Sequence, residues 1–134
     1  MLVKLVEATT HDGWEHHVIS LRGEGALGER VRTAGAVLTT LDMPRGIPSW
    51  SGVLKLRRAA AGWKPAVIQG WMYHGNLAAL VASANEAPVV WNVRQSLPSM
   101  EHERPLTRAV IRMGAALSAR PRAILYNSRA GARD

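Results

Sequence analysis

Apolar and polar residues follow two different spacings along this chain, and the two spacings alternate. Short apolar runs bounded by Gly, Pro or polar residues are typical of buried strands, whereas apolar residues three or four positions apart are typical of helices. The short runs predict strands at residues 17–21, 36–41, 66–70, 89–93 and 123–127. The longer spacing predicts helices at residues 2–10, 27–35, 49–61, 77–84 and 105–119.

The regular alternation of strands and helices predicts an α/β fold. Strand–helix–strand units bring successive strands together in parallel, and their helices cover the faces of the sheet. A chain of 134 residues is long enough for one domain with a sizeable core and too short for two ordinary domains. We therefore expect residues 1–134 to form a single Rossmann-like three-layer domain with a mostly parallel sheet of about five strands.

The sequence also predicts the caps and the inward-facing residues of three helices. Gly35 is expected in the left-handed conformation that closes the helix at residues 27–35, and Ser49 or Ser51 is expected to cap the next helix. In that next helix the residues expected to face inward are Trp50, Val53, Leu56 and Ala60. In the helix at residues 105–119 they are Leu106, Val110, Met113 and Leu117.

The composition adds a strong positive charge. Lys and Arg total 17 against 10 Asp and Glu, so the net charge is +7, which favours phosphate-bearing partners or an anionic membrane surface. The chain has no Cys, which excludes disulfides and thiol chemistry and is compatible with a reducing cytoplasm. The longest apolar-rich stretch, residues 77–84, is too short to cross a bilayer. We expect a cytoplasmic location, with peripheral contact at the inner face of the membrane as an option.

Polar and aromatic side chains follow two of the expected strands. The strand at residues 66–70 leads into Trp71, Tyr73, His74 and Asn76, and the strand at residues 89–93 leads into Arg94, Gln95 and Ser96. In an open parallel sheet the carboxyl ends of the strands border a shared crevice in which ligands bind. The sequence therefore predicts a ligand site at these two strand ends.

Two of these side chains carry useful chemistry. The imidazole of His74 can act as an acid, a base or a hydrogen-bond donor, and the alternative is a capping or surface histidine. The guanidinium of Arg94 can bind a phosphate or carboxylate through two hydrogen bonds, and the alternative is a solvated residue at a sheet edge. His11, His16 and His17 have no partners at a metal-binding spacing, so no metal site is expected.

A glycine pattern at Gly23, Gly25 and Gly28 offers a different hypothesis. It follows a strand, opens a helix and is trailed by Asp42, as in the NAD(P)- or FAD-binding fingerprint. Against this hypothesis, the helix is short, and Glu24 and Glu29 put negative charge where a pyrophosphate would bind. We favour a structural turn, and a cofactor-binding Rossmann domain remains the alternative.

Two basic surfaces suggest a third, non-catalytic alternative. One is a stripe of Arg104, Arg108 and Arg112 on the helix at residues 105–119, and the other comprises Trp50, Lys55, Arg57, Arg58, Trp63 and Lys64. Such groups are usually solvated faces, with the tryptophans in the core, but basic charge beside apolar area also fits anionic lipid. Nucleic acid is not an expected partner, because no recognised binding motif is present.

Several segments resemble the amino-terminal domain of the two-domain (GT-B) retaining glycosyltransferases of family four, the group-one glycosyltransferases. These segments are Gln69–Leu77, Val89–Ser96 and Ile124–Ser128, and the loop Gly23–Arg30 within Val18–Leu41 is also similar. The similarity covers nearly the whole chain, and the run Trp71-Met72-Tyr73-His74 is its most specific part. The resemblance accounts for the glycine pattern without a dinucleotide.

The resemblance implies a domain that faces a glycan or lipid-linked acceptor, while a carboxyl-terminal domain holds the nucleotide-sugar donor. It implies no metal and no other cofactor. Many members have a histidine where this chain has Arg94, so Arg94 is expected to contact a phosphate or the acceptor, and His74 is the only nearby imidazole. The expected catalytic residues are thus His74 and Arg94, and the expected substrate-binding residues are Trp71, Tyr73, Asn76, Gln95, Ser96 and Ser128.

The chain also departs from the family pattern at both ends. Residues 2–6 match the helix that follows the family's first strand and its glycine-rich loop, and no donor-binding domain follows residue 134 in the given sequence. We expect a domain truncated at both ends, with little or no transferase activity alone. The alternative is a complete five-stranded domain with a frayed tail.

Overall fold

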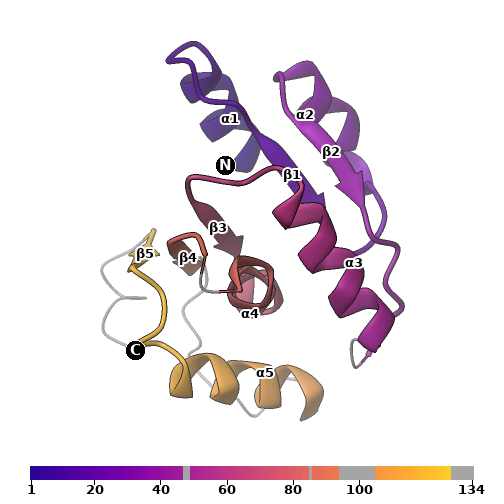
Figure 1. Ribbon diagram of the computed structural model, residues 1–134, viewed down its shortest axis with the longest axis vertical. Helices are drawn as coiled ribbons and strands as arrows, with labels where there is room; N and C mark the ends of the chain where they lie inside the picture. The colour runs from indigo at the N-terminus through magenta and orange to yellow at the C-terminus, as the bar shows by residue number, and fades with distance from the viewer. Residues whose placement is uncertain (47–48, 85, 94–104, 128–134) are drawn as a thin grey trace. The chain divides into compact units, whose positions relative to one another are not determined.

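A computed structural model describes residues 1–46, 49–84, 86–93 and 105–127 (Figure 1). The chain divides into two compact units, Met1–Ala59 and Ala60–Asp134. Helices and strands alternate throughout, and all strand pairs are parallel. The α/β class with parallel strands is therefore confirmed, with the hydrogen bonds dividing the strands into a sheet of two and a sheet of three.

The first unit is built on a parallel pair of strands. It contains α1 (Leu2–Thr10), β1 (His17–Ser20), the short 3-10 helix η1 (Gly25–Leu27), α2 (Gly28–Thr33), β2 (Val37–Thr40) and most of α3 (Trp50–Ala61). Strand β1 pairs with β2, with His17 opposite Val37. Val3 and Val6 of α1 pack with Val31 of α2 in the core of this unit, because both helices turn their apolar faces toward each other.

Helix α2 ends as its sequence predicts. Gly35 has φ +97°, a conformation that costs a glycine little, and a Cβ there would lie 3.2 Å from Cγ2 of Thr10. Because the glycine also lets the chain pass close to α1, the turn joins α2 to β2 without a loop. The predicted left-handed glycine is confirmed.

Helix α3 corrects one prediction. The Oγ atom of Ser49 accepts a hydrogen bond from the Gly52 backbone N–H at 3.2 Å, so Ser49 rather than Ser51 caps the helix. Leu56 is buried as expected, but the Trp50 side chain is 76% exposed, so its predicted inward position is wrong. At about 100° per residue, Trp50 lies on the same face as Leu54, four positions on, and not on the face of Leu56.

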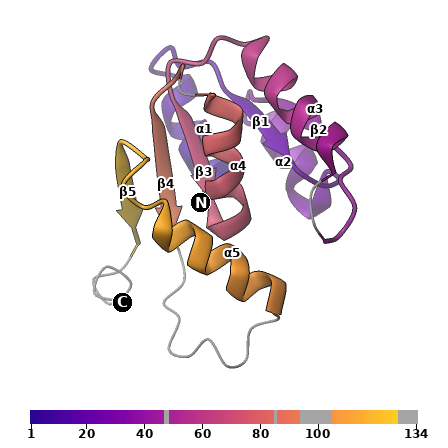
Figure 2. The ribbon, with the colours of Figure 1, turned by 60° about the horizontal axis from the view of Figure 1, so that its bottom comes forward.

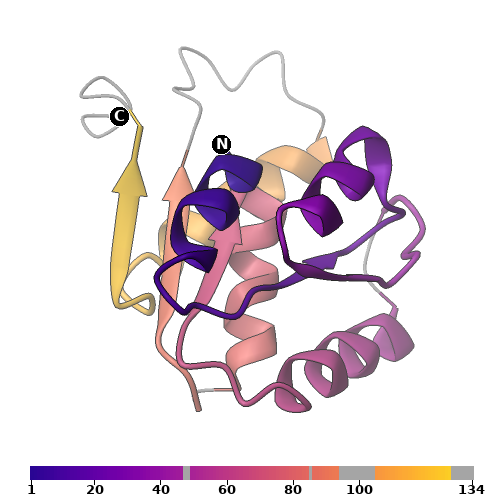
Figure 3. The ribbon, with the colours of Figure 1, turned by 90° about the horizontal axis from the view of Figure 1, so that it is seen from above.

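The second unit contains a three-stranded parallel sheet with β4 in the centre. Its elements are β3 (Ile68–Trp71), α4 (Met72–Ser83), β4 (Val89–Val93), α5 (Pro105–Ala116) and β5 (Ala123–Tyr126). Figure 3 shows the three strands side by side and pointing the same way, and Figure 2 shows α4 alongside β3 and β4. The register places Ile68 opposite Val89 and Trp91 opposite Ile124, so these side chains share one face of the sheet.

The core of the second unit lies between this face and α4. Val89 and Trp91 of β4 are buried against Ala79 of α4, and the partly buried Ile68, Leu77, Leu80, Leu117 and Ile124 surround them. Parallel strands covered by a helix bury nearly continuous apolar runs, which is why these strands were predictable.

Helix α5 is rotated relative to its predicted orientation. Leu106 and Met113 are 41% and 53% exposed, so their expected inward positions are wrong. The partly buried residues of α5 are Thr107, Arg108, Val110, Ile111 and Gly114. Because α5 packs against α4, its inward side is set by this contact and not by the apolar stripe alone.

The pair His17 and Thr39 predicts how stability depends on pH. The His17 Nε2 atom lies 2.7 Å from Thr39 Oγ1 across the β1–β2 pair, and burial lowers the pKa of His17. The unfolded chain, with a histidine pKa of about 6.5, therefore binds more protons than the folded chain just below that pH. We expect the free energy of unfolding in urea to fall as the pH drops below about 6.5 toward the lower folded-state pKa.

Replacing this imidazole should flatten that dependence. His17→Gln is expected to lose less stability than the wild type on going from neutral to mildly acid pH. His11→Gln is the matched control, because His11 is exposed in the turn after α1. Equal pH slopes for His17→Gln and the wild type would contradict the assignment.

Candidate functional site

The junction between β3 and α4 has no loop. Strand β3 ends at Trp71 and helix α4 begins at Met72, five positions before Leu77, the first of the apolar residues from which the helix was predicted. Met72 has φ +62°, a left-handed conformation that non-glycine residues adopt rarely and at a cost. The chain reverses at this one residue, so Tyr73 and His74 lie in the first turn of the helix.

Close packing between helix and strand fixes this junction. A Cβ at Gly70 would lie 2.6 Å from the Cα of Asn76 and 2.8 Å from the carbonyl oxygen of Gly75. Both of these are backbone atoms, so only a glycine lets α4 lie this close to β3. This contact therefore fixes where the first turns of α4 lie against β3.

Asn76 holds the helix to the neighbouring strand. Its side chain is only 3% exposed, and its Oδ1 accepts a hydrogen bond from the backbone N–H of Asn92 in β4 at 3.3 Å. A buried amide needs such a partner, because an unsatisfied polar group in the interior is costly. The structure thus gives Asn76, a predicted substrate-binding residue, a positioning contact inside the unit.

Three other predicted site residues sit together around the start of α4. Trp71 and Tyr73 are partly buried, whereas His74 is exposed. The first turn of α4 contains no acidic residue, and Trp71 makes no side-chain capping bond. The amides of a helix N-terminus attract anions, so an anionic group near His74 meets both these amides and an imidazole.

The other strands of this sheet end at the same edge. Trp71 is opposite Asn92, and Val93 is opposite Tyr126, so β3, β4 and β5 finish at neighbouring positions. Arg94, Gln95 and Ser96 follow β4, but they and Ser128 lie outside the described residues. Tyr126 is the last residue of β5 and Asn127 follows it, so both lie at this edge as well, although the sequence reasoning did not name them as site residues.

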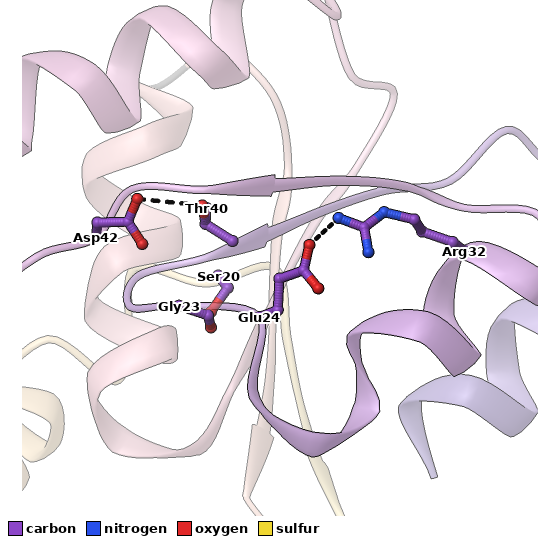
Figure 4. A network of polar contacts seen from close by, with 6 residues as sticks. All are labelled: Ser20, Gly23, Glu24, Arg32, Thr40 and Asp42. Atoms are coloured by element: carbon purple, nitrogen blue, oxygen red, sulfur yellow. Dashed lines mark hydrogen bonds and ion pairs between the residues drawn. The ribbon is translucent and has the colours of Figure 1, made fainter.

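The glycine pattern of the first unit lies around a charged contact (Figure 4). Glu24 and Arg32 form an ion pair, and the Arg32 guanidinium lowers the pKa of the Glu24 carboxyl, so this group stays ionised. The Glu24 side chain also covers Gly28, where a Cβ would lie 2.9 Å from the Glu24 Oε2 atom. A carboxylate therefore occupies the start of α2, where a dinucleotide would need to bring its pyrophosphate.

The rest of this polar network is also internal to the unit. The Ser20 hydroxyl donates to the Gly23 carbonyl at 2.8 Å, and the Thr40 hydroxyl donates to the Asp42 carboxylate at 3.4 Å. Helix α2 has only six residues, which makes its dipole weak. The geometry does not favour the NAD(P) or FAD alternative.

In the described part of the chain, no three His, Asp or Glu side chains are grouped so that they could hold a metal ion. No helix among the described residues is long and apolar enough to cross a membrane. Of the predicted arginine stripe, Arg104 is outside the described residues, Arg108 is partly buried and Arg112 is exposed.

The alternating helices and parallel strands define a Rossmann-like α/β fold. The family model described as Glycosyltransferase Family 4 matches residues 1–134, and the chain belongs to that family. This confirms the resemblance seen in the sequence. Searches of curated proteins and of solved structures gave no match.

The close contact at Gly70 predicts the effect of adding one methyl group. Gly70→Ala is expected to lower the free energy of unfolding by about 1–3 kcal/mol, because backbone atoms of α4 must move. Urea unfolding followed by circular dichroism measures this change.

Gly114→Ala is the matched control for that substitution. Gly114 lies in α5, and a Cβ there would meet nothing within 4 Å. Alanine favours helix, so this variant should gain up to about 1 kcal/mol. Equal effects of the two substitutions would contradict a specific contact between β3 and α4.

Proposed function

We propose that this chain is the acceptor-side domain of an enzyme that transfers a sugar from a nucleotide-sugar to a glycan or lipid-linked acceptor. The observation that carries the proposal is the β3–α4 junction, where Trp71, Tyr73 and the exposed His74 meet a helix N-terminus at the edge where the strands end. Membership of Glycosyltransferase Family 4 supports sugar transfer as the reaction class.

The residues at the junction suit the chemistry of an acceptor. In sugar transfer the bond between the anomeric carbon and the donor phosphate oxygen breaks, a bond to the acceptor oxygen forms, and the acceptor hydroxyl loses its proton. The His74 imidazole can orient that hydroxyl and accept its proton. The rings of Trp71 and Tyr73 offer apolar faces with polar edges, which suit the mixed surface of a sugar.

Basic and polar residues beyond the strands would complete the site. We expect Arg94 to contact a phosphate or the acceptor, with Gln95, Ser96 and Ser128 adding hydrogen bonds. The amides at the start of α4 would help to stabilise negative charge there without a metal ion. The nucleotide-sugar donor is expected to bind mainly to a second domain.

Binding can be tested on the isolated chain by NMR. The ¹⁵N-labelled protein would be titrated with short oligosaccharides, with farnesyl phosphate as a soluble lipid-phosphate probe, and with NAD⁺. We expect an oligosaccharide or farnesyl phosphate to shift the amides of residues 71–76 and the Trp71 indole N–H. Shifts confined to Gly23–Gly28 on adding NAD⁺ would support the cofactor alternative and contradict this proposal.

Substitution of His74 separates a binding role from a structural one. His74→Gln should weaken binding of the responding probe roughly three- to tenfold, the worth of one hydrogen bond, with an unchanged spectrum elsewhere. His11→Gln, an exposed histidine in the other unit, is the control and should not change the affinity. Unchanged affinity in His74→Gln would remove His74 from the site.

The division of labour between two domains gives one more prediction. We expect the 134-residue chain alone to show little or no sugar transfer from UDP-glucose or GDP-mannose, measured as release of the nucleotide diphosphate. Efficient transfer by the isolated chain would contradict a donor site on a second domain.

A further inference from the structure

The outer face of α3 exposes two large apolar side chains next to each other. Trp50 is 76% exposed and Leu54 is 36% exposed, and residues four positions apart lie on the same face of a helix. The opposite face carries Leu56 and Ala60, which are 6% and 5% exposed. The helix is thus apolar on two sides. The side with Leu56 and Ala60 is buried, and the side with Trp50 and Leu54 is exposed.

Positive charge surrounds this exposed apolar pair. Lys55, Arg57 and Arg58 are all exposed, and the two arginines follow Leu54 by three and four positions, so they flank it. No Asp or Glu occurs between Asp42 and Glu86. The basic residues of that stretch, Arg45, Lys55, Arg57, Arg58 and Lys64, carry five positive charges of a chain whose net charge is +7.

We infer that the outer face of α3 docks onto an anionic lipid bilayer. Trp50 and Leu54 would insert at the level of the headgroups, where a tryptophan ring is favoured, while Lys55, Arg57 and Arg58 contact lipid phosphates. Charge complementarity selects the anionic surface, and the apolar pair distinguishes a bilayer from nucleic acid, because an aliphatic Leu54 adds nothing to contact with a sugar–phosphate backbone. This docking stands on α3 alone and is independent of the proposed acceptor site.

The expected binding is reversible and sensitive to salt. One short helix face supplies a small apolar area, so stable association needs the basic residues as a second source of affinity. Each basic residue near an anionic surface contributes roughly fivefold in partitioning, so the Arg57 and Arg58 pair contributes about twenty-five-fold. Screening at high ionic strength should remove most of this electrostatic contribution to binding.

Co-sedimentation of the full chain with vesicles tests the inference. The vesicles would be phosphatidylcholine alone or an equimolar mixture with phosphatidylglycerol, at about 0.05 M and about 0.5 M NaCl. We expect binding to the anionic vesicles at low salt and little binding to neutral ones. R57Q/R58Q should bind about twentyfold more weakly, and W50S/L54S should lose at least about tenfold.

Matched controls keep the test specific. Arg22→Gln with Arg30→Gln removes the same charge from exposed positions elsewhere, and Trp14→Ser removes a tryptophan that is 53% exposed outside α3. These controls should bind much more tightly than the α3 variants, and circular dichroism should show all variants folded. Brominated lipids should quench fluorescence in the wild type more than in Trp50→Ser.

Three results would overturn the inference. They are equal binding to neutral and anionic vesicles, equal losses in the α3 variants and the controls, and vesicle binding that the α3 substitutions leave unchanged. If a single-stranded oligonucleotide bound instead and only its affinity fell in the α3 variants, the face would be a nucleic-acid surface.

Discussion

The second unit depends on one steric constraint, the contact between Gly70 of β3 and the backbone of Asn76 in α4. A Cβ at Gly70 would come within 2.6 Å of the helix, so the helix can rest on the strand only where no side chain intervenes. This contact lets α4 begin directly after β3. It also brings Asn76 to the backbone of β4, and it leaves Tyr73 and His74 at the strand edge. The left-handed Met72 is the local cost of that arrangement, since backbone strain persists where the surrounding packing fixes it.

The strands were predictable because they are short apolar runs of the kind that parallel sheets use, although burial differs between them, from the largely buried β4 to the largely exposed β5. The apolar spacing that predicted α4 does not extend to its first turn, because residues 72–76 contain a glycine and polar side chains. Their helical state follows from the contact with β3, which no local pattern encodes. The orientations of Trp50 and Met113 escaped prediction for a related reason. Apolar character identifies a helix face, but the neighbouring elements decide which face is covered.

The strand ends around the candidate site were predictable, and the roles of the residues there stay predictions. Strand ends of parallel sheets collect polar groups, and that rule led to Trp71, Tyr73 and His74 from the sequence alone. It also led to Asn76, whose side chain is buried and bonded to β4. A polar residue one turn into a helix can face either the ligand or the sheet, and here Gly70 opens the space that draws Asn76 to the sheet.

In the first unit, the spacing of the glycines matches a dinucleotide-binding loop, but the charge beside them does not. Gly23, Gly25 and Gly28 have the spacing of a dinucleotide loop, and they do join a strand to a helix. Yet the first residue of that helix is covered by the Glu24 carboxylate, which Arg32 keeps ionised, so negative charge already occupies the position where a pyrophosphate would bind. At the start of α4 the first turn has no acidic residue, and the adjacent side chain is an imidazole. The two helix starts thus differ in the charge of the side chains beside their amides, and this difference supports the proposal that a phosphate or a polar substrate binds at the second start.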